Sequence, residues 1–287
     1  GLHGSPAGAM RFEGASGQMI GAPGRGLSQL FTMIELMRLQ VGGQGAGLAL
    51  ACADLARAYA ADRKQGGKPT APPVPIDTHP DVQRMLIGID ARAMLSTSLI
   101  CEAAVAVQAG RDDPEMTAYA AFLLPLAKTF NGEGASRAAS DCIQVLGGAG
   151  YTREWPAERY YRDARITTIY EGTTGMQGQD FLMRRLGKDQ GAGLAVLAGR
   201  MRDSGDALGL RLLERFEALS AKVLSRDAGA QMAAADAVMR AGWVLTSAYL
   251  AARLMSVSGC ADAMQFWRGT LEAKMGLHEA EVARAIG

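Results

Sequence analysis

Residues 27–62 carry the pattern that most constrains the fold of this chain. Their apolar side chains recur every three or four positions, which is the spacing along one face of an α-helix. These side chains are Leu27, Leu30, Phe31, Ile34, Val41, Leu48, Cys52, Leu55 and Tyr59. A long amphipathic helix has to bury such a face against other elements. We therefore predict a helix from about Leu27 to Asp62 and expect helical partners elsewhere in the chain.

Arg38 interrupts this apolar face, because it falls on the same stripe between Ile34 and Val41. A guanidinium among apolar neighbours needs an anionic partner. Glu35, three residues earlier, can reach it along the helix surface. A ligand or a catalytic carboxylate is the alternative partner, and the residue pattern alone leaves both open.

Three further helices are predicted before residue 188. Helical spacing places them at about 81–110, at about 114–146 and after Gly172. Between the first two helices of the chain, residues 65–80 hold five prolines, which predicts an exposed connection. Together with residues 27–62, these segments predict an antiparallel four-helix bundle.

The composition changes after a glycine-rich stretch at residues 187–193 that looks like a hinge. Beyond it the chain is rich in Ala, Leu and Met. Three more amphipathic helices are predicted, at roughly 194–224, 228–257 and 261–285. They carry no cluster of polar residues that suggests chemistry. We predict a helical packing or oligomerisation module here.

Residues 1–26 are the only part with a β pattern. Residues 10–12 and 18–20 flank a Gly-containing turn, as in a hairpin. A lone hairpin is marginally stable in water, so these strands would belong to a sheet whose other strands are absent. The expected fold is all-α with a short β remnant. Its expected domains are residues 1–26, 27–188 and 189–287.

Charge and composition exclude several kinds of partner. The 30 basic and 29 acidic residues nearly cancel, which leaves no large field of one sign for nucleic acid or an anionic membrane. No apolar run reaches the roughly 18 residues of a transmembrane helix. The four cysteines are scattered in helical-looking segments, where we expect them to be buried in a reducing, cytoplasmic protein. The three histidines lie far apart, and no metal site is expected.

Glu171 is the candidate for chemistry. It follows the bulky residues Ile169 and Tyr170 and precedes Gly172, so its carboxylate has few polar neighbours in the sequence. Burial of that kind raises the pKa of a carboxylate and makes it a proton acceptor near neutral pH. Gly172 lets a ligand approach the backbone closely. The alternative is a surface glutamate at a plain loop-to-helix junction.

The segments on either side of Glu171 bear on this choice. Residues 151–169 are dense in aromatic and charged side chains, which suits a packed, hydrogen-bonded segment next to a site. A solvated loop with salt bridges is the alternative. After Glu171, Thr173 or Thr174 can cap a helix that begins near Gly175.

Several motifs follow one another in order along the first two thirds of the chain. They are the entry Ile20–Leu27, the stretch Gln144–Gly148 before Gly150 and Tyr151, the run Arg162–Ile166, and Ile169–Thr173 followed by Gln177. In this order and spacing they resemble the end of the flavin-dependent acyl-CoA dehydrogenases, and the resemblance covers roughly residues 1–188. The tail, and the pattern Arg63-x-Gln65-Gly66, are more similar to the longer bacterial branch that includes 3-methylmercaptopropionyl-CoA dehydrogenase.

The resemblance implies an activity. Members of the family take an α-proton from an acyl-CoA thioester and pass a β-hydride to FAD, which gives the 2,3-enoyl-CoA, and an electron-transfer flavoprotein receives the electrons. In the family a helical domain and a β domain precede the bundle. Residues 3–6 resemble the middle of that β domain, so this chain would start inside it. We expect the isolated chain to bind flavin poorly and to be inactive by itself.

The resemblance also assigns residues. Glu171 is the base, and a backbone N–H beside it can hydrogen-bond the thioester oxygen. The implied substrate residues are Arg38, Tyr170 and Gly172, and the implied flavin residues are Thr173, Gln177, Arg63, Gln144, Gly147 and Gly148. The last four match positions that reach the flavin of a neighbouring subunit, so a homodimer or homotetramer is implied.

Two other functions stay open at this point. One is a non-catalytic helical module for oligomerisation or interaction, which would be colourless. The other is an acyl-CoA oxidase, which shares the fold and the base but passes electrons to oxygen. A flavin absorbance band separates the enzymes from the module, and oxygen consumption separates the oxidase from the dehydrogenase.

Overall fold

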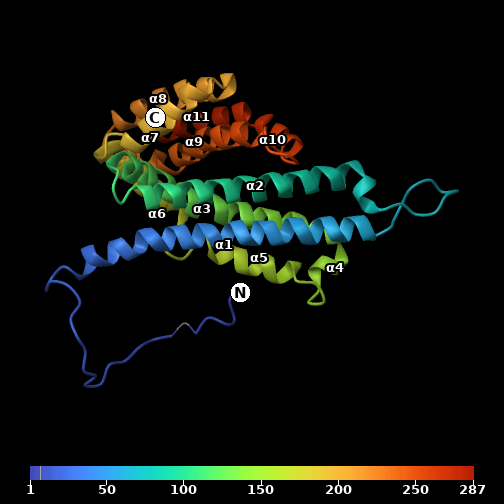
Figure 1. Cartoon of the computed structure of the whole chain (residues 1–287), viewed down its shortest axis with the longest axis horizontal. Helices are drawn as coiled ribbons and strands as arrows, with labels where there is room; N and C mark the ends of the chain where they lie inside the picture. Colours follow the sequence, from blue (N-terminus) through green and yellow to red (C-terminus); the bar gives the residue numbers. More distant parts are fainter. Residues whose placement is uncertain (7) are drawn as a thin grey trace.

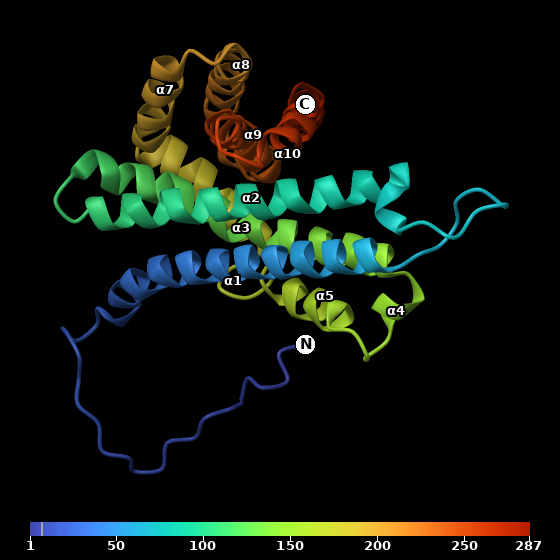
Figure 2. The ribbon, with the colours of Figure 1, turned by 45° about the vertical axis from the view of Figure 1, so that its right-hand side comes forward.

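Three long helices lie side by side and form the body of the protein (Figure 1). The computed structural model describes residues 1–6 and 8–287, with the side chains of all of these except residues 31 and 32. The long helices are α1 (Gly26–Asp62), α2 (Pro80–Ala109) and α3 (Pro114–Leu146). They alternate in direction, so α1 and α3 end at the same end of the molecule (Figure 2). The all-α prediction is confirmed.

The start of α3 shows how the sequence sets a helix boundary. Asp113 accepts hydrogen bonds from the backbone N–H groups of Glu115 and Met116, at 2.9 and 3.4 Å. Pro114 takes the first helical position, where its missing N–H costs nothing. Pro80 plays the same part in α2. The exposed connection between α1 and α2 contains only the short 3₁₀ turn η1 (Ile76–Thr78).

Shorter helices follow α3. They are α4 (Gly148–Tyr151), α5 (Ala157–Ile166), α6 (Thr174–Gln179) and the π-helical segment η2 (Asp180–Lys188). Residues 157–166 form helix α5 and not a loop, and this helix packs against α3 and α1. The predicted packed segment is observed, since Trp155 meets Tyr59 of α1 edge to face at 5.2 Å.

The C-terminal helices cover the α2 side of the body (Figure 1). They are α7 (Ala192–Ser204), α8 (Ala207–Leu224), α9 (Ala228–Leu254), α10 (Ala261–Arg268) and α11 (Leu271–Ala285). The single helix predicted at 194–224 is wrong. Gly205 has a φ of +64°, which ends α7, and the Asp206 carboxylate accepts the Gly209 N–H at 2.7 Å and starts α8.

One apolar core runs through α2, α3 and the C-terminal helices, and a second one packs α1 against α2 and α3. Three phenylalanine rings mark its path: Phe122 of α3 lies 5.1 Å from Phe181 of η2, and Phe181 lies 6.5 Å from Phe216 of α8. Gly193 permits this close packing, because a Cβ there would lie 2.4 Å from the Ala118 carbonyl oxygen. The predicted boundary near residue 188 therefore crosses a continuous core, and the division into domains stays a prediction.

Residues 10–12 and 18–20 do not form the predicted strands. The described residues contain no β-strand and one isolated bridge, between Lys64 and Pro75. Met10 and Ile20 are 79% and 91% exposed. Strands need cross-strand partners to bury one face, and no described residue pairs with residues 10–12 or 18–20. The first residues of the chain lie next to α5, where the Leu2 N–H donates to Asp163 at 2.7 Å.

In the described part of the chain, none of the helices combines the length and the hydropathy of a membrane span, and His, Cys, Asp and Glu side chains form no group that could hold a metal ion. Cys52 and Cys142 are buried as expected. Cys101 is exposed and Cys260 is half-buried, which corrects the expectation that all four cysteines are interior.

Candidate active site

Glu171 lies on a tight loop between α5 and α6. Its φ is +55° and that of Gly172 is +90°. A non-glycine residue with a positive φ has a strained backbone. Such residues are often found at functional sites, where the surrounding structure holds them in place. The neighbouring Gly172 meets no such penalty because it lacks a Cβ. The sequence singled out this glycine for close approach of a ligand, and the structure adds that its backbone has a positive φ.

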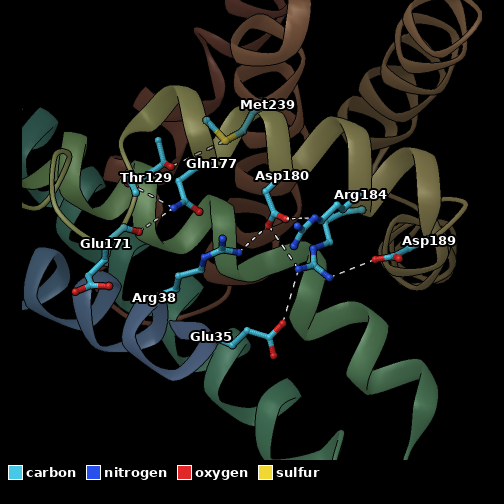
Figure 3. Close-up of polar contacts among 11 residues, drawn as sticks. Glu35, Arg38, Thr129, Glu171, Gln177, Asp180, Arg184, Asp189 and Met239 are labelled. Carbon is cyan, nitrogen blue, oxygen red and sulfur yellow. Dashed lines mark hydrogen bonds and ion pairs between the residues drawn. The ribbon is translucent and has the colours of Figure 1, made fainter. Parts of the chain in front are cut away.

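Two buried side chains hold the loop from beneath. Lys128 of α3 is fully buried and donates from Nζ to the Gly172 carbonyl oxygen at 2.5 Å. Gln177 of α6 donates from Nε2 to the carbonyl oxygens of Glu171 and Gly172, at 3.2 and 3.4 Å. These bonds fix the backbone and leave the Glu171 side chain to point outward (Figure 3).

Lys128 also shapes the charge beneath the loop. Burial, and to a smaller extent the positive charge of Arg38, lower the pKa of its ammonium to about 8. The negative charges of Glu171 and Glu133 oppose this shift. Lys128 is thus close enough to Glu171 for the two charges to interact.

A pocket of about 500 Å³ opens beside the loop. Four residues singled out from the sequence line it together: Arg38, Glu171, Gly172 and Gln177. The other lining residues are Ile34, Met176, Gln179, Asp180, Met183 and Arg184. Among the described residues, no hydrogen bond or ion pair engages the Glu171 carboxylate. A half-buried acid without a partner faces a space that a small molecule can enter.

The partner of Arg38 is Asp180, at 2.6 Å from Nη1 to Oδ2 (Figure 3). Both residues are only 8% exposed. The expectation of an anionic partner is confirmed, but neither Glu35 nor Glu171 fills that place. Glu35 is 3.8 Å from Arg185, which itself lies 3.5 Å from Asp180. Removing one partner of such a buried pair would leave a buried charge uncompensated.

Buried polar atoms without a hydrogen bond gather at this pocket. In the described part of the chain they include Arg38 Nε, Gln177 Oε1 and Asp180 Oδ1. Buried donors and acceptors are nearly always satisfied in folded proteins, so each exception needs an explanation. Here all three belong to residues that line one pocket. Asp180 Oδ1 has an ion pair with Arg184 at 3.6 Å, whereas Arg38 Nε and Gln177 Oε1 could be satisfied by a ligand.

Tyr170 and Thr173 flank the site without lining the pocket. The Tyr170 hydroxyl donates to Gln44 of α1. Burial raises the pKa of this phenol, and the negative charge of Glu171 raises it further. Thr173 stands at the N-cap position of α6, but its side chain makes no capping hydrogen bond.

The other four sequence candidates lie where α1 and α3 end, away from the Glu171 pocket. Arg63 follows the end of α1, while Gln144, Gly147 and Gly148 lie where α3 ends (Figure 2). Arg38 and Arg63 are 25 positions apart on or just past one helix, so roughly 37 Å separates them. The structure does not bring this group to the Glu171 pocket of the same chain. All four residues are exposed.

Lys128, Asp180 and Arg185 are the site residues that sequence reasoning missed. Lys128 sits within an apolar run, Leu123–Phe130, and a lysine in such a run is a signal that could have found it. Asp180 has no such signal, because it is 142 residues from Arg38 and stands in a charged segment.

Comparisons with known proteins identify the family of this chain. Residues 24–186 match the family model described as acyl-CoA dehydrogenase, C-terminal domain. The chain belongs to the acyl-CoA dehydrogenase family. The predicted resemblance is confirmed, including its bacterial branch: 3-methylmercaptopropionyl-CoA dehydrogenase of Ruegeria pomeroyi is 36% identical, over 67% of this chain and 34% of that protein.

Two further members of the family extend the match into the C-terminal helices. Broad-specificity linear acyl-CoA dehydrogenase FadE5 of Mycobacterium tuberculosis is 35% identical, over 87% of this chain and 42% of the relative. The fold matches the crystal structure of acyl-CoA dehydrogenase complexed with FAD from Bacillus anthracis, with a TM-score of 0.71 and 18% identity, over 92% of this chain and 51% of that one. The chain thus spans less than half the length of the curated relatives that it matches.

Proposed function

We propose that this chain supplies the C-terminal part of an FAD-dependent acyl-CoA dehydrogenase, in which Glu171 removes the α-proton of an acyl-CoA thioester. One observation carries the proposal: the Glu171 carboxylate has no partner in the described chain and lines a pocket, while the backbone of Glu171 has a strained, positive φ. A carboxylate held for structure alone would have a hydrogen-bond donor nearby. A carboxylate kept for proton transfer has to leave its lone pairs accessible.

The residues around Glu171 position it for this step. Lys128 and Gln177 clamp the carbonyl oxygens of the loop, so the base stays at one place while the substrate enters. The Lys128 ammonium offsets part of the negative charge that gathers at the thioester as the proton leaves. Arg38 stays tied to Asp180 and presents its unbonded Nε at the pocket wall.

The residues present fit a bound flavin. Gln177 has a buried Oε1 without a hydrogen-bond partner in the described chain, and such an acceptor suits an N–H or O–H of a cofactor. When bound, FAD supplies the acceptor for the β-hydride. Thr173 and Gln177 would contact it on this side. The distant group of Arg63, Gln144, Gly147 and Gly148 fits the flavin of a neighbouring subunit.

Further partners follow from the same proposal. A homodimer or homotetramer explains why one group of flavin residues lies at the Glu171 pocket and the other at the far end of α1 and α3. An electron-transfer flavoprotein would receive the electrons. We also infer that residues 1–26 belong to a β domain, since their exposed apolar side chains have nothing to pack against in this chain. The isolated chain is then expected to bind FAD weakly, which a fluorescence titration measures.

Glu171→Gln in a full-length dehydrogenase that carries this chain tests the proposal. Gln keeps the shape of Glu but accepts no proton, so flavin stays bound while anaerobic bleaching of the flavin by acyl-CoA slows by on the order of 10²–10⁴. The loss should appear in the chemical step and not in ligand affinity. Flavin content of the purified variant shows that the fold is intact.

Glu35→Gln is the matched control. Glu35 is an acid near the same pocket, but it lies 3.8 Å from Arg185 and its side chain is 52% exposed. Bleaching in this variant should stay within a factor of about three of the wild type, well below the range expected for a general base. If Glu35→Gln stops the reaction and Glu171→Gln does not, the proposed roles are wrong.

A further inference from the structure

A second cavity lies between the long helices and the C-terminal helices, away from Glu171. Its volume is about 210 Å³, and it shares no lining residue with the Glu171 pocket. Helices α2 and α3 form one wall, and α9, α10 and α11 form the other. It is too small for an acyl chain with its CoA, and its size suits a compact molecule.

Three aromatic rings give this cavity a rigid apolar wall. Phe130 and Trp243 stack with ring centres 5.2 Å apart and planes 9° apart. Trp267 meets Trp243 at 6.3 Å, and its indole N–H donates to the Ser247 hydroxyl at 3.1 Å. The polar atom of Trp267 is thus satisfied within the protein. The Lys274 ammonium lies over one face of its ring, 3.9 Å from the ring centre, so the ring and this cation stand side by side at the cavity.

The arginines at this cavity all have carboxylate partners. Arg240 holds Glu133 at 2.9 and 3.0 Å and also pairs with Asp236. Arg92 and Arg137 share Asp141, at 3.5 and 3.3 Å. These pairs neutralise the guanidinium charges, so the arginines by themselves give no reason for an anion to bind here.

Lys274 is different, because no carboxylate of the described chain pairs with it. Its ammonium lies 3.9 Å from the centre of the Trp267 ring. Burial, and to a smaller extent the nearby charge of Arg92, together lower the pKa of this lysine to about 8. A cation that is partly removed from water and lacks a counter-ion gains from an anionic partner.

We propose that this cavity is a second ligand site, which binds a small monoanion with an aromatic or branched apolar body, such as a one-ring carboxylic acid. The carboxylate pairs with Lys274, and the apolar body lies against Trp243 and Trp267. The proposal does not rest on the function assigned to Glu171. It gives the C-terminal helices a binding role that their sequence did not suggest.

Phenylacetate is the probe, and phenylacetamide is its neutral counterpart of nearly the same shape. Isothermal titration of the whole chain should show saturable binding of phenylacetate with a dissociation constant of about 1 mM or below. The amide should bind about tenfold more weakly or worse, because it lacks the charge that Lys274 selects. Quenching of tryptophan emission locates the binding at Trp243 and Trp267.

Two variants test the site independently. Lys274→Gln should remove the preference for the acid over the amide, while Lys222→Gln, at an exposed lysine of α8, keeps it. Gly134→Leu should block both probes, because a Cβ there has only Ser96 Oγ nearby, at 3.6 Å, and the longer side chain enters the cavity. Gly47→Leu, at an exposed glycine of α1, is its control.

The outcomes separate cleanly once circular dichroism shows that each variant is helical. Binding that prefers the acid, that loses this preference in Lys274→Gln and that is absent in Gly134→Leu supports the site. Equal binding of acid and amide overturns the assignment of Lys274. Absence of saturable binding by either probe shows a cavity that holds only water, and the proposal then fails.

Discussion

The Glu171 pocket and the Lys274 cavity have similar linings, but the unpaired side chain is acidic in the first and basic in the second. Each is lined by arginines that have carboxylate partners. Each also has a charged side chain without an oppositely charged partner among the described residues, which is Glu171 in the first and Lys274 in the second. The difference lies in burial. Arg38 and Asp180 are nearly inaccessible, whereas the side chains of Arg240 and Glu133 are 29% and 33% exposed. The charged wall is therefore part of the interior at the first site and part of the surface at the second.

Asp180→Ala should give the largest effect that separates the two sites. It leaves Arg38 buried without its partner, which costs about 3–5 kcal/mol of unfolding free energy. Glu133→Ala should cost about 1 kcal/mol or less, because Arg240 is half-exposed and keeps Asp236. Urea unfolding of the isolated chain measures both.

The double variant Arg38→Met with Asp180→Leu makes this comparison sharper. It removes both charges from the interior, so most of the stability lost in Asp180→Ala should return. A double variant as unstable as the single one would show that the pair contributes through geometry and not through charge balance.

Alanine at one glycine near each site should have opposite effects. A Cβ at Gly45 of α1 would lie 2.5 Å from the Asn131 carbonyl oxygen of α3, so Gly45→Ala should destabilise the chain by about 1–3 kcal/mol. Gly134→Ala meets no atom closer than 3.6 Å and gains helix propensity, about 0.5–1 kcal/mol. Thermal unfolding followed by circular dichroism gives both values. Equal losses would contradict the difference in packing.

The pH dependence of stability should reveal both buried lysines. Lys128 and Lys274 each have a pKa of about 8 in the folded chain, below the ordinary value of 10.5. Between these values the unfolded chain binds more protons, so each lysine makes stability rise with pH, by at most about 1.4 kcal/mol per pH unit. Below about pH 8 both states are protonated and the effect on the slope vanishes.

Comparison with Lys274→Met isolates one of these contributions. The slope between about pH 8 and 10.5 should fall in the variant and the stability at neutral pH should rise, because the cost of burying a charge is gone. Unfolding in urea at several pH values supplies the data. Identical slopes in variant and wild type would mean that Lys274 is better solvated than its position indicates.

The sequence specified much of the Glu171 site, for a local reason. The residue pattern singled out Glu171 and Gly172 and predicted a helix just beyond them, where α6 begins at Thr174; Gln177 came from the family resemblance and not from this pattern. Arg38 stood out because a charge interrupts an apolar stripe. Each of these signals lies within a few residues of the position that it concerns, so a pattern can carry it.

The contacts between residues on different helices depended on the tertiary structure. The sequence by itself determined a helical chain, the spacing of its long helices and the loop that carries Glu171. Only the folded chain decided that Asp180 and not Glu35 holds Arg38, that Lys128 lies beneath Gly172, and that Lys274 faces two tryptophans. Helical periodicity fixes which face of a helix is apolar, but not which distant helix covers it. Pairings across the core depend on how all the helices pack together.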